Sequence, residues 1–142
     1  MEVYSSSSLS CDIVRGLHGD VYLGSRIDED PHFLKYNIDA SYQRYVNETN
    51  NLLLSVKTQY SADKLPLVEM FALGGMNSVR GFDPSYRLGD SGYSSSIEWV
   101  YHPKFENEWF KDSLQVGLFI DHGRVYVNDP VAEQHSTDEL TG

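Results

Sequence analysis

The residue with the clearest chemical potential is Arg80, which stands in a stretch rich in apolar residues and glycine. The stretch runs from Phe71 to Phe82 and reads FALGGMNSVRGF, and its glycines permit tight turns of the backbone. A guanidinium presents a planar fork that holds a carboxylate with two hydrogen bonds. Taken alone, Arg80 is more simply interpreted as an exposed loop charge. The apolar residues around it nevertheless predict a loop that folds inward against another part of the protein.

Two carboxylates stand on the side of extended stretches that is opposite to their apolar neighbours. Asp121 alternates with Leu118 and Ile120, so it faces the opposite side of an extended strand from those two residues. Glu98 alternates in the same way with its own apolar neighbours on an earlier stretch. If the apolar residues face outward, both carboxylates face inward. The simpler interpretation of Asp121, taken alone, is a turn carboxylate before Gly123.

Other chemistries find no support in the sequence. It contains no phosphate-binding or dinucleotide-binding glycine pattern, no Ser-His-Asp arrangement and no paired metal-ligand histidines. The five histidines are scattered, and the single cysteine, Cys11, is expected to be a small packed residue. The acidic run 28–30 is interpreted as a solvated charge run rather than a cation site. We therefore expect no enzymatic activity, no cofactor and no metal site.

Net charge and hydropathy argue against nucleic-acid-binding proteins and against proteins with transmembrane helices. The net charge of −10 argues against a nucleic-acid partner, because phosphate binding requires clustered Lys and Arg. No apolar run reaches the roughly 18 residues that a transmembrane helix requires. The first ten residues show no secretory signal, so for a barrel fragment we expect the true N-terminus to lie elsewhere.

Long stretches of alternating apolar and polar residues predict β-strands that must position Arg80 and the carboxylates. The stretches are Leu34–Val46, Leu52–Tyr60, Tyr93–His102 and one that begins at Leu114, with a weaker strand expected around Leu9–Leu23. No helix of any length is convincing. Strands that cross a membrane need about 9–11 residues, whereas strands of soluble proteins average about 5–6. The lengths here favour membrane strands, and aromatic residues near the strand ends suit interfacial girdles.

The connections between the stretches alternate in length. Short turns are expected at Asn47–Asn51 and Pro103–Asp112, and long connections at Gly24–His32, Ser61–Gly92 and after Val127. Outer-membrane barrels alternate short periplasmic turns with long extracellular loops. The fold class predicted is therefore all-β, an antiparallel transmembrane β-barrel segment of four or five strands with a long inward-folded loop. A soluble β-sandwich binding module remains an alternative from another class.

Four short motifs follow one another along the chain, at Phe71–Gly75, Ser78–Phe82, Gly89–Gly92 and Ser96–Glu98. A later segment, Leu118–Val125, contains the pattern Phe-x-Asp-x-Gly. In this order, the motifs resemble the signature of the two-partner secretion transporters, the haemolysin secretion/activation proteins ShlB/FhaC/HecB. The superfamily of these transporters includes the barrel-assembly protein BamA.

The resemblance implies a 16-stranded barrel in the bacterial outer membrane, preceded by two periplasmic POTRA domains and a plug helix. The loop at about residues 61–92 is then the sixth extracellular loop, folded into the lumen, and its Val-Arg-Gly-Phe tip is needed for secretion. Arg80 then meets Asp121 in the barrel wall, with Glu98 as a possible second partner. The site residues expected are Gly74, Gly75, Val79, Arg80, Gly81 and Phe82 in the loop, Gly89 and Asp90 at its end, Asp121 and Glu98 in the wall, and Phe119 and Gly123 in the second motif.

Residues 1–142 are thus expected to be a partial outer-membrane barrel domain without a POTRA domain. The residues after Asp129 read as an acidic loop with no further strand, so the chain resembles a fragment or a truncated reading frame. The parent protein is expected to export a haemolysin- or adhesin-type exoprotein. Its other expected partners are the lipid bilayer with lipopolysaccharide and the rest of the barrel with its POTRA domains. A barrel-assembly insertase of the same superfamily is the nearer alternative.

Overall fold

The computed structural model describes residues 4–17, 32–104, 114–128 and 137–142. The acidic run 28–30 and most of the turn expected at Pro103–Asp112 lie outside the described residues. The elements in chain order are β1 (Ser5–Leu17), β2 (His32–Asn47), β3 (Asn50–Ser61), the 3-10 helix η1 (Leu67–Glu69), β4 (Phe71–Leu73), β5 (Arg87–Gly89), β6 (Ser91–Tyr101), β7 (Val116–Tyr126) and β8 (Thr137–Thr141).

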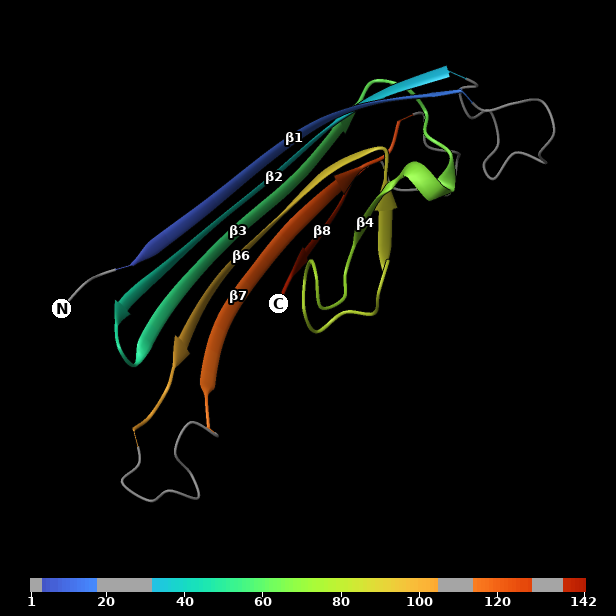
Figure 1. Cartoon of the computed structure of the whole chain (residues 1–142). Coiled ribbons are helices and arrows are strands. Elements are labelled where there is room, and N and C mark those ends of the chain that lie inside the picture. Colours follow the sequence, from blue (N-terminus) through green and yellow to red (C-terminus); the bar gives the residue numbers. More distant parts are fainter. Residues whose placement is uncertain (1–3, 18–31, 105–113, 129–136) are drawn as a thin grey trace.

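The large strands form one six-stranded antiparallel sheet in the order β1-β2-β3-β6-β7-β8 (Figure 1). The prediction that the alternating stretches are neighbours in one sheet, in the order in which they occur, is therefore confirmed. The weaker N-terminal stretch is also a strand, although it lies earlier than expected, at Ser5–Leu17. In the described part of the chain, no helix is long and apolar enough to cross a membrane.

The expectation that no strand follows Asp129 is wrong. β8 pairs with β7 and places Glu139 opposite Arg124, whose Nη2 lies 3.3 Å from the Glu139 Oε2. Asp138 lies 3.3 Å from the Nε of Arg87. Acidic residues are poor strand formers, which hid the strand in the sequence. Opposite charges directly across a ladder favour the pairing.

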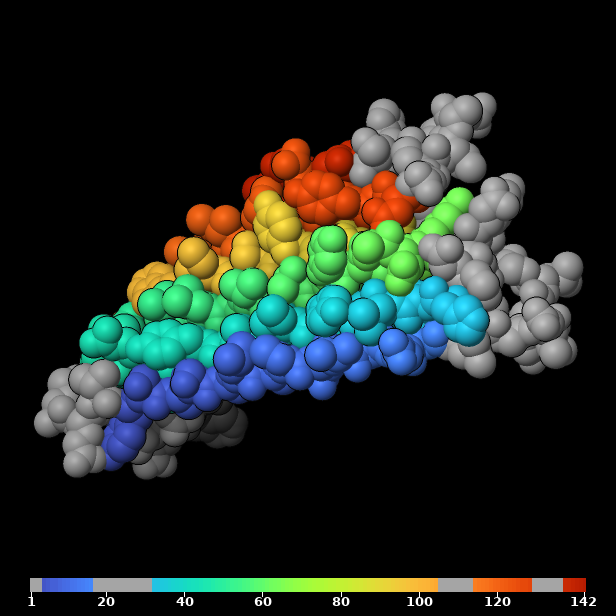
Figure 2. Space-filling model, turned by 90° about the horizontal axis from the view of Figure 1, so that it is seen from above, coloured from blue at the N-terminus to red at the C-terminus, as the bar shows by residue number. Residues whose placement is uncertain are grey.

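The two faces of the sheet carry different residues, as the alternation predicts. Residues opposite each other in an antiparallel ladder lie on the same face. One such row joins Leu54, Ile97 and Ile120. Figure 2 shows the strands side by side on an uncovered face of the sheet, and many large apolar side chains of the outward face are exposed. Exposed residues on it are Leu9, Ile13, Ile38, Val56, Ile97, Leu118 and Ile120. The separation of faces is therefore confirmed, but Cys11 is exposed on the outward face rather than packed.

The long connection between β3 and β6 folds against the opposite, inward face. Figure 1 shows η1, β4 and β5 together on one side of the curved sheet. β4 and β5 pair as a small antiparallel ribbon within the connection. The core lies between this loop and the sheet, in two clusters of buried apolar residues. The clusters are Leu73, Val79, Val125 and Leu140, and Phe33, Leu65 and Met70. The predicted inward folding of the loop is confirmed.

Candidate functional site: the loop tip and its carboxylates

The tip of the loop, residues 74–82, owes its shape to glycines. Gly74 and Gly81 have φ angles of 109° and 93°, a region that residues with a side chain rarely adopt. A Cβ atom at Gly74 would lie only 2.4 Å from the carbonyl oxygen of Asp83. The tip is closed by the N–H of Gly75, which donates to the carbonyl oxygen of Phe82 over 3.1 Å. This tight turn presents the residue before Gly81 to the sheet.

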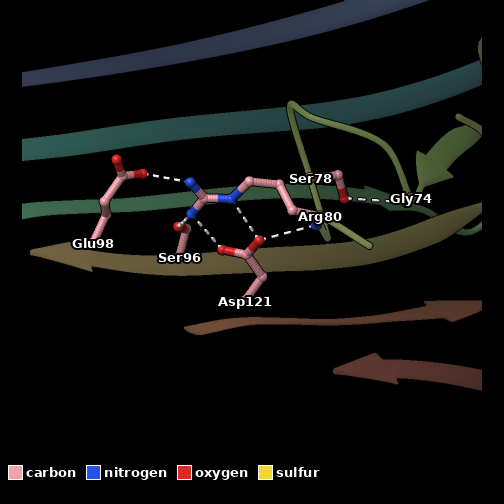
Figure 3. Close-up of polar contacts among 6 residues, drawn as sticks. All are labelled: Gly74, Ser78, Arg80, Ser96, Glu98 and Asp121. Atoms are coloured by element: carbon pink, nitrogen blue, oxygen red, sulfur yellow. Dashed lines mark hydrogen bonds and ion pairs between the residues drawn. The ribbon is translucent and has the colours of Figure 1, made fainter. Parts of the chain in front are cut away.

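Arg80 holds the carboxylate of Asp121 with a two-pronged contact (Figure 3). Its Nε donates to Oδ2 and its Nη2 donates to Oδ1, each over 2.8 Å. The backbone N–H of Arg80 donates to the same Oδ2 over 2.9 Å. The Asp121 side chain is completely buried, and its partner Arg80 is 16% exposed. The carboxylate of Asp121 therefore accepts hydrogen bonds from both the side chain and the backbone of Arg80.

The rest of the guanidinium is also engaged. Nη1 lies 2.5 Å from the Oε2 of Glu98, and Nη2 donates to the hydroxyl of Ser96 over 2.9 Å. The carbon at the centre of the guanidinium lies 3.6 Å from the centroid of the Phe119 ring, a cation–π contact. The hydrogen bond to Asp121, together with Glu98, raises the pKa of Arg80 despite the opposing effect of burial. Arg80 is thus fixed as a cation between two strands.

Apolar packing holds the tip next to this polar contact. Val79 is completely buried against Leu73 of β4 and Val125 and Leu140 of the sheet. Gly123 makes room for the approach, because a Cβ atom there would lie 2.3 Å from the Cδ1 of Leu73. The second sequence motif therefore supplies both the carboxylate and the space in front of it.

Phe82 packs against the same apolar cluster. Its ring also stacks at an angle on Tyr86, with 5.5 Å between the centroids. Phe82 therefore supports the turn from the side of the returning chain.

The loop-end residues Gly89 and Asp90 have a separate place. Asp90 is completely buried, and its carboxylate accepts hydrogen bonds from the backbone N–H of Leu65 over 2.8 Å and of Asn128 over 2.7 Å. A Cβ atom at Gly89 would lie 2.7 Å from the Cβ of Val125. These two residues close the base of the loop rather than its tip.

Sequence reasoning missed Ser96 as a partner of Arg80. Its signal was present, since Ser96 lies two residues before Glu98 and therefore shares its face of β6. It also missed Lys35 and Gln59, which contact the loop near its ends. Among the described residues, no group of His, Cys, Asp and Glu could hold a metal ion. The ion pair of Arg80 with the buried Asp121 fastens the tip of the loop to the sheet.

Comparison with known proteins places this geometry in a family. Residues 6–142 match the family described as haemolysin secretion/activation protein ShlB/FhaC/HecB. The outer membrane transporter CdiB of Escherichia coli O6:K15:H31 (strain 536 / UPEC) is 43% identical over 60 residues, which are 42% of this chain and 10% of the relative. The CdiB of Dickeya dadantii (strain 3937) is 33% identical over 112 residues, 71% of this chain and 20% of the relative.

The solved structure of CdiB from Escherichia coli superposes with a TM-score of 0.75 and 27% identity, over 96% of this chain and 26% of that one. The chain thus spans 10–26% of the length of these relatives. In the described residues, the six-stranded sheet leaves its apolar outward face uncovered, as in an unclosed barrel segment, and no second large sheet packs on it as in a sandwich. Since the family match runs over residues 6–142, the chain belongs to the haemolysin secretion/activation protein family ShlB/FhaC/HecB.

Proposed function

We propose that this chain is the segment of an outer-membrane polypeptide transporter in which a lumenal loop is fastened to the barrel wall. The observation that carries the proposal is the contact of Arg80 with Asp121 and Glu98 at the tip of an inward-folded loop. The family is one of secretion and activation proteins, and the relatives are outer membrane transporters. The transported polypeptide is an exoprotein of the haemolysin or adhesin type, exported by two-partner secretion without nucleotide hydrolysis.

The geometry suits a loop that is held in one defined position. A guanidinium held by two carboxylates has little freedom, because the planar fork fixes its orientation, and the backbone N–H of Arg80 donates to Asp121 as well. The loop covers the inward face of β6 and β7, where a polypeptide inside a barrel would pass. Moving the tip away from Asp121 would open that face, and the antiparallel ladder would stay intact because it does not depend on Arg80.

The outward face supports the outer membrane as the site of action. Large apolar side chains such as Ile97 and Leu118 are more than half exposed there, at 54% and 62%. A soluble protein rarely leaves so wide an apolar surface uncovered. Lipid is the partner that suits it, with lipopolysaccharide in the outer leaflet and the remaining strands and POTRA domains of the parent beside it. The family match favours secretion over barrel assembly.

Secretion by a full-length carrier tests the proposal. The carrier is either the complete parent protein or the Escherichia coli CdiB with its matching segment exchanged for this chain, expressed with its exoprotein partner. Arg80→Ala should strongly reduce the amount of exoprotein outside the cell. The barrel should still insert, and in an unheated sample it should still migrate on a gel at the position of the folded protein. The matched control is Arg87→Ala, since Arg87 lies in the same loop and its ion pair within the described residues is with the partly exposed Asp138, at 3.3 Å. Normal secretion by Arg80→Ala would refute the assigned role.

A further inference from the structure

The loop is held a second time, where its two arms leave and rejoin the sheet. The side-chain amide of Gln59, on β3, donates one hydrogen bond to the carbonyl oxygen of Glu69 over 3.0 Å and another to that of Asp90 over 3.1 Å. Glu69 lies on the outgoing arm of the loop and Asp90 ends the returning arm. One buried amide, 7% exposed, therefore bridges both arms. We call the group formed by Gln59, Lys35 and the backbone of Glu69 and Asp90 the neck.

Lys35, on β2, sets the orientation of that amide. Its ammonium donates to the Oε1 of Gln59 over 3.3 Å and to the carbonyl oxygen of Glu69 over 3.0 Å. It also lies 2.9 Å from the Oε2 of Glu69. An ammonium has only donors, so the amide must turn its oxygen toward Lys35 and its two N–H groups toward the arms. Lys35 is only 9% exposed, and a buried ammonium requires such acceptors.

The neck and the tip are separate groups of residues. The neck uses Lys35 and Gln59 from β2 and β3, whereas the tip uses Glu98 and Asp121 from β6 and β7. The neck holds backbone carbonyls of the arms, and the tip holds one charged side chain. Nothing in this arrangement requires the neck to open when Arg80 leaves its carboxylates.

We propose that Lys35 and Gln59 are positioning residues that clip the neck of the loop, so that the tip can leave the wall while both arms remain fixed. The proposal rests on the proposed function, because it assigns to the transporter loop a moving tip and a stationary base. The movement at the tip then opens the inward face of β6 and β7 without releasing the loop from the lumen. After the polypeptide has passed, the fixed arms return Arg80 to the same carboxylates.

Lys57 provides a matched control for Lys35. Both lysines face inward, but Lys57 is exposed and makes no ion pair among the described residues. Substituting Lys57 by Met removes a lumenal charge of the same kind and leaves the neck intact. A general effect of lumenal charge would appear in both lysine variants, whereas a clip would appear only in Lys35→Met.

Hydrogen–deuterium exchange on the full-length carrier in detergent tests the clip without reference to transport. Gln59→Glu keeps the size of the side chain and gives Lys35 a carboxylate, but it removes both N–H donors to the arms. Exchange in residues 63–73, including the amide of Leu65, should accelerate by about tenfold or more. Residues 76–82 should keep their protection. Lys35→Met should do the same, Lys35→Arg should retain most of the protection, and Lys57→Met should match the unaltered carrier.

The pattern of exchange in these variants decides whether the clip exists. Unchanged exchange in residues 63–73 for both Gln59→Glu and Lys35→Met would overturn the clip. Equal acceleration of the neck, the tip and strands β3 and β6 would show a general structural role, which also overturns it. If Gln59→Glu does not insert, Gln59→Asn retains a neutral amide too short to span both arms and should give the same local acceleration. The secretion assay of Arg80→Ala is a separate measurement, so either proposal can fail without the other.

Discussion

Ile97 and Glu98 are neighbours on β6, yet they meet opposite surroundings. Ile97 faces outward and is 54% exposed, with Leu54 and Ile120 directly opposite it on the neighbouring strands. Glu98 faces inward and holds Arg80 at 2.5 Å. In a soluble sheet the apolar face would be covered and the polar face would be open. Here the covered face is the polar one, which is the inversion expected when lipid replaces the core.

The inward face also differs in the size of its residues. A cross-strand row of the sheet joins Ser41, Ser55, Ser96 and Asp121. Small hydroxyl side chains leave space in front of the sheet and retain hydrogen-bonding capacity. Ser96 uses that capacity on Arg80. The outward face requires only apolar residues of suitable length, whereas the inward face depends on particular side chains at particular positions.

The largest effect is expected from breaking the contact between loop and wall. Because Asp121 is completely buried, removing one partner leaves an uncompensated charge and should cost about 3–5 kcal/mol of loop docking. Arg80→Ala and Asp121→Ala should each accelerate amide exchange in residues 74–82 of the full-length carrier. The double variant should be little worse than either single variant, because both remove the same contact.

The conservative variant sharpens this test. Arg80→Lys should restore only part of the protection, because an ammonium cannot make the two-pronged contact. If the effects of Arg80→Ala and Asp121→Ala instead add fully, the tip is held by a different contact, and Glu98→Gln is the next variant to measure.

The second prediction compares the faces directly on β2. Arg at Ile38 faces outward near the middle of the strand and should destabilise the inserted barrel by roughly 2–4 kcal/mol. Arg at Ser41 faces inward, where water and carboxylates are available, and should cost much less. Urea unfolding of the carrier in lipid vesicles measures both variants. Equal destabilisation by Ile38→Arg and Ser41→Arg would contradict the assignment of the faces.

The third prediction concerns close packing on the inward face. Gly123→Ala places a Cβ atom 2.3 Å from Leu73 and 2.9 Å from the carbonyl oxygen of Tyr93, so it should destabilise the docked loop by about 1–3 kcal/mol. Gly117→Ala, on the same strand and face, is the control, because its nearest neighbour would be 3.7 Å away. The measurement is again amide exchange in residues 74–82. Similar effects of the two variants would show that strand glycine itself, not the loop contact, is responsible.

The strands could be predicted where apolar and polar residues alternate along the sequence. The stretch Leu34–Val46 alternates because one side meets lipid and the other a polar lumen, and it is β2 in the structure. β8 escaped prediction because its acidic residues meet Arg124 and Arg87, which belong to other strands. An isolated acidic segment carries no sign of the cations that it will meet.

The candidate site shows the same limit at the level of single residues. The alternation of apolar and polar residues along each strand placed the carboxylates of Asp121 and Glu98 on the inward face. Alternation does not show which loop residue contacts them, and the resemblance to the family motifs identified Arg80 as that residue. Lys35 and Gln59 carried no signal, because an alternating lysine or glutamine on a lumenal face is ordinary. Their role follows only from the register of β2 and β3 and the path of the loop.

The smallest effect is expected from an ion pair outside both faces. Glu48, in the turn between β2 and β3, pairs with Lys104 after β6, and both side chains are largely exposed, at 72% and 66%. The hydrogen bond from Lys104, with its charge, lowers the pKa of Glu48. A lowered carboxyl pKa contributes stability above the unfolded-state pKa and loses it as the pH falls through the folded-state value. Since exposed pairs are screened by solvent and salt, Glu48→Gln should leave the thermal midpoint of the carrier unchanged at neutral pH and physiological salt. A small deficit should emerge only at low salt and disappear in acid, where the unaltered carboxyl is protonated. A deficit at neutral pH that persists in high salt would show that the turn carries a structural contact comparable to those of the inward face.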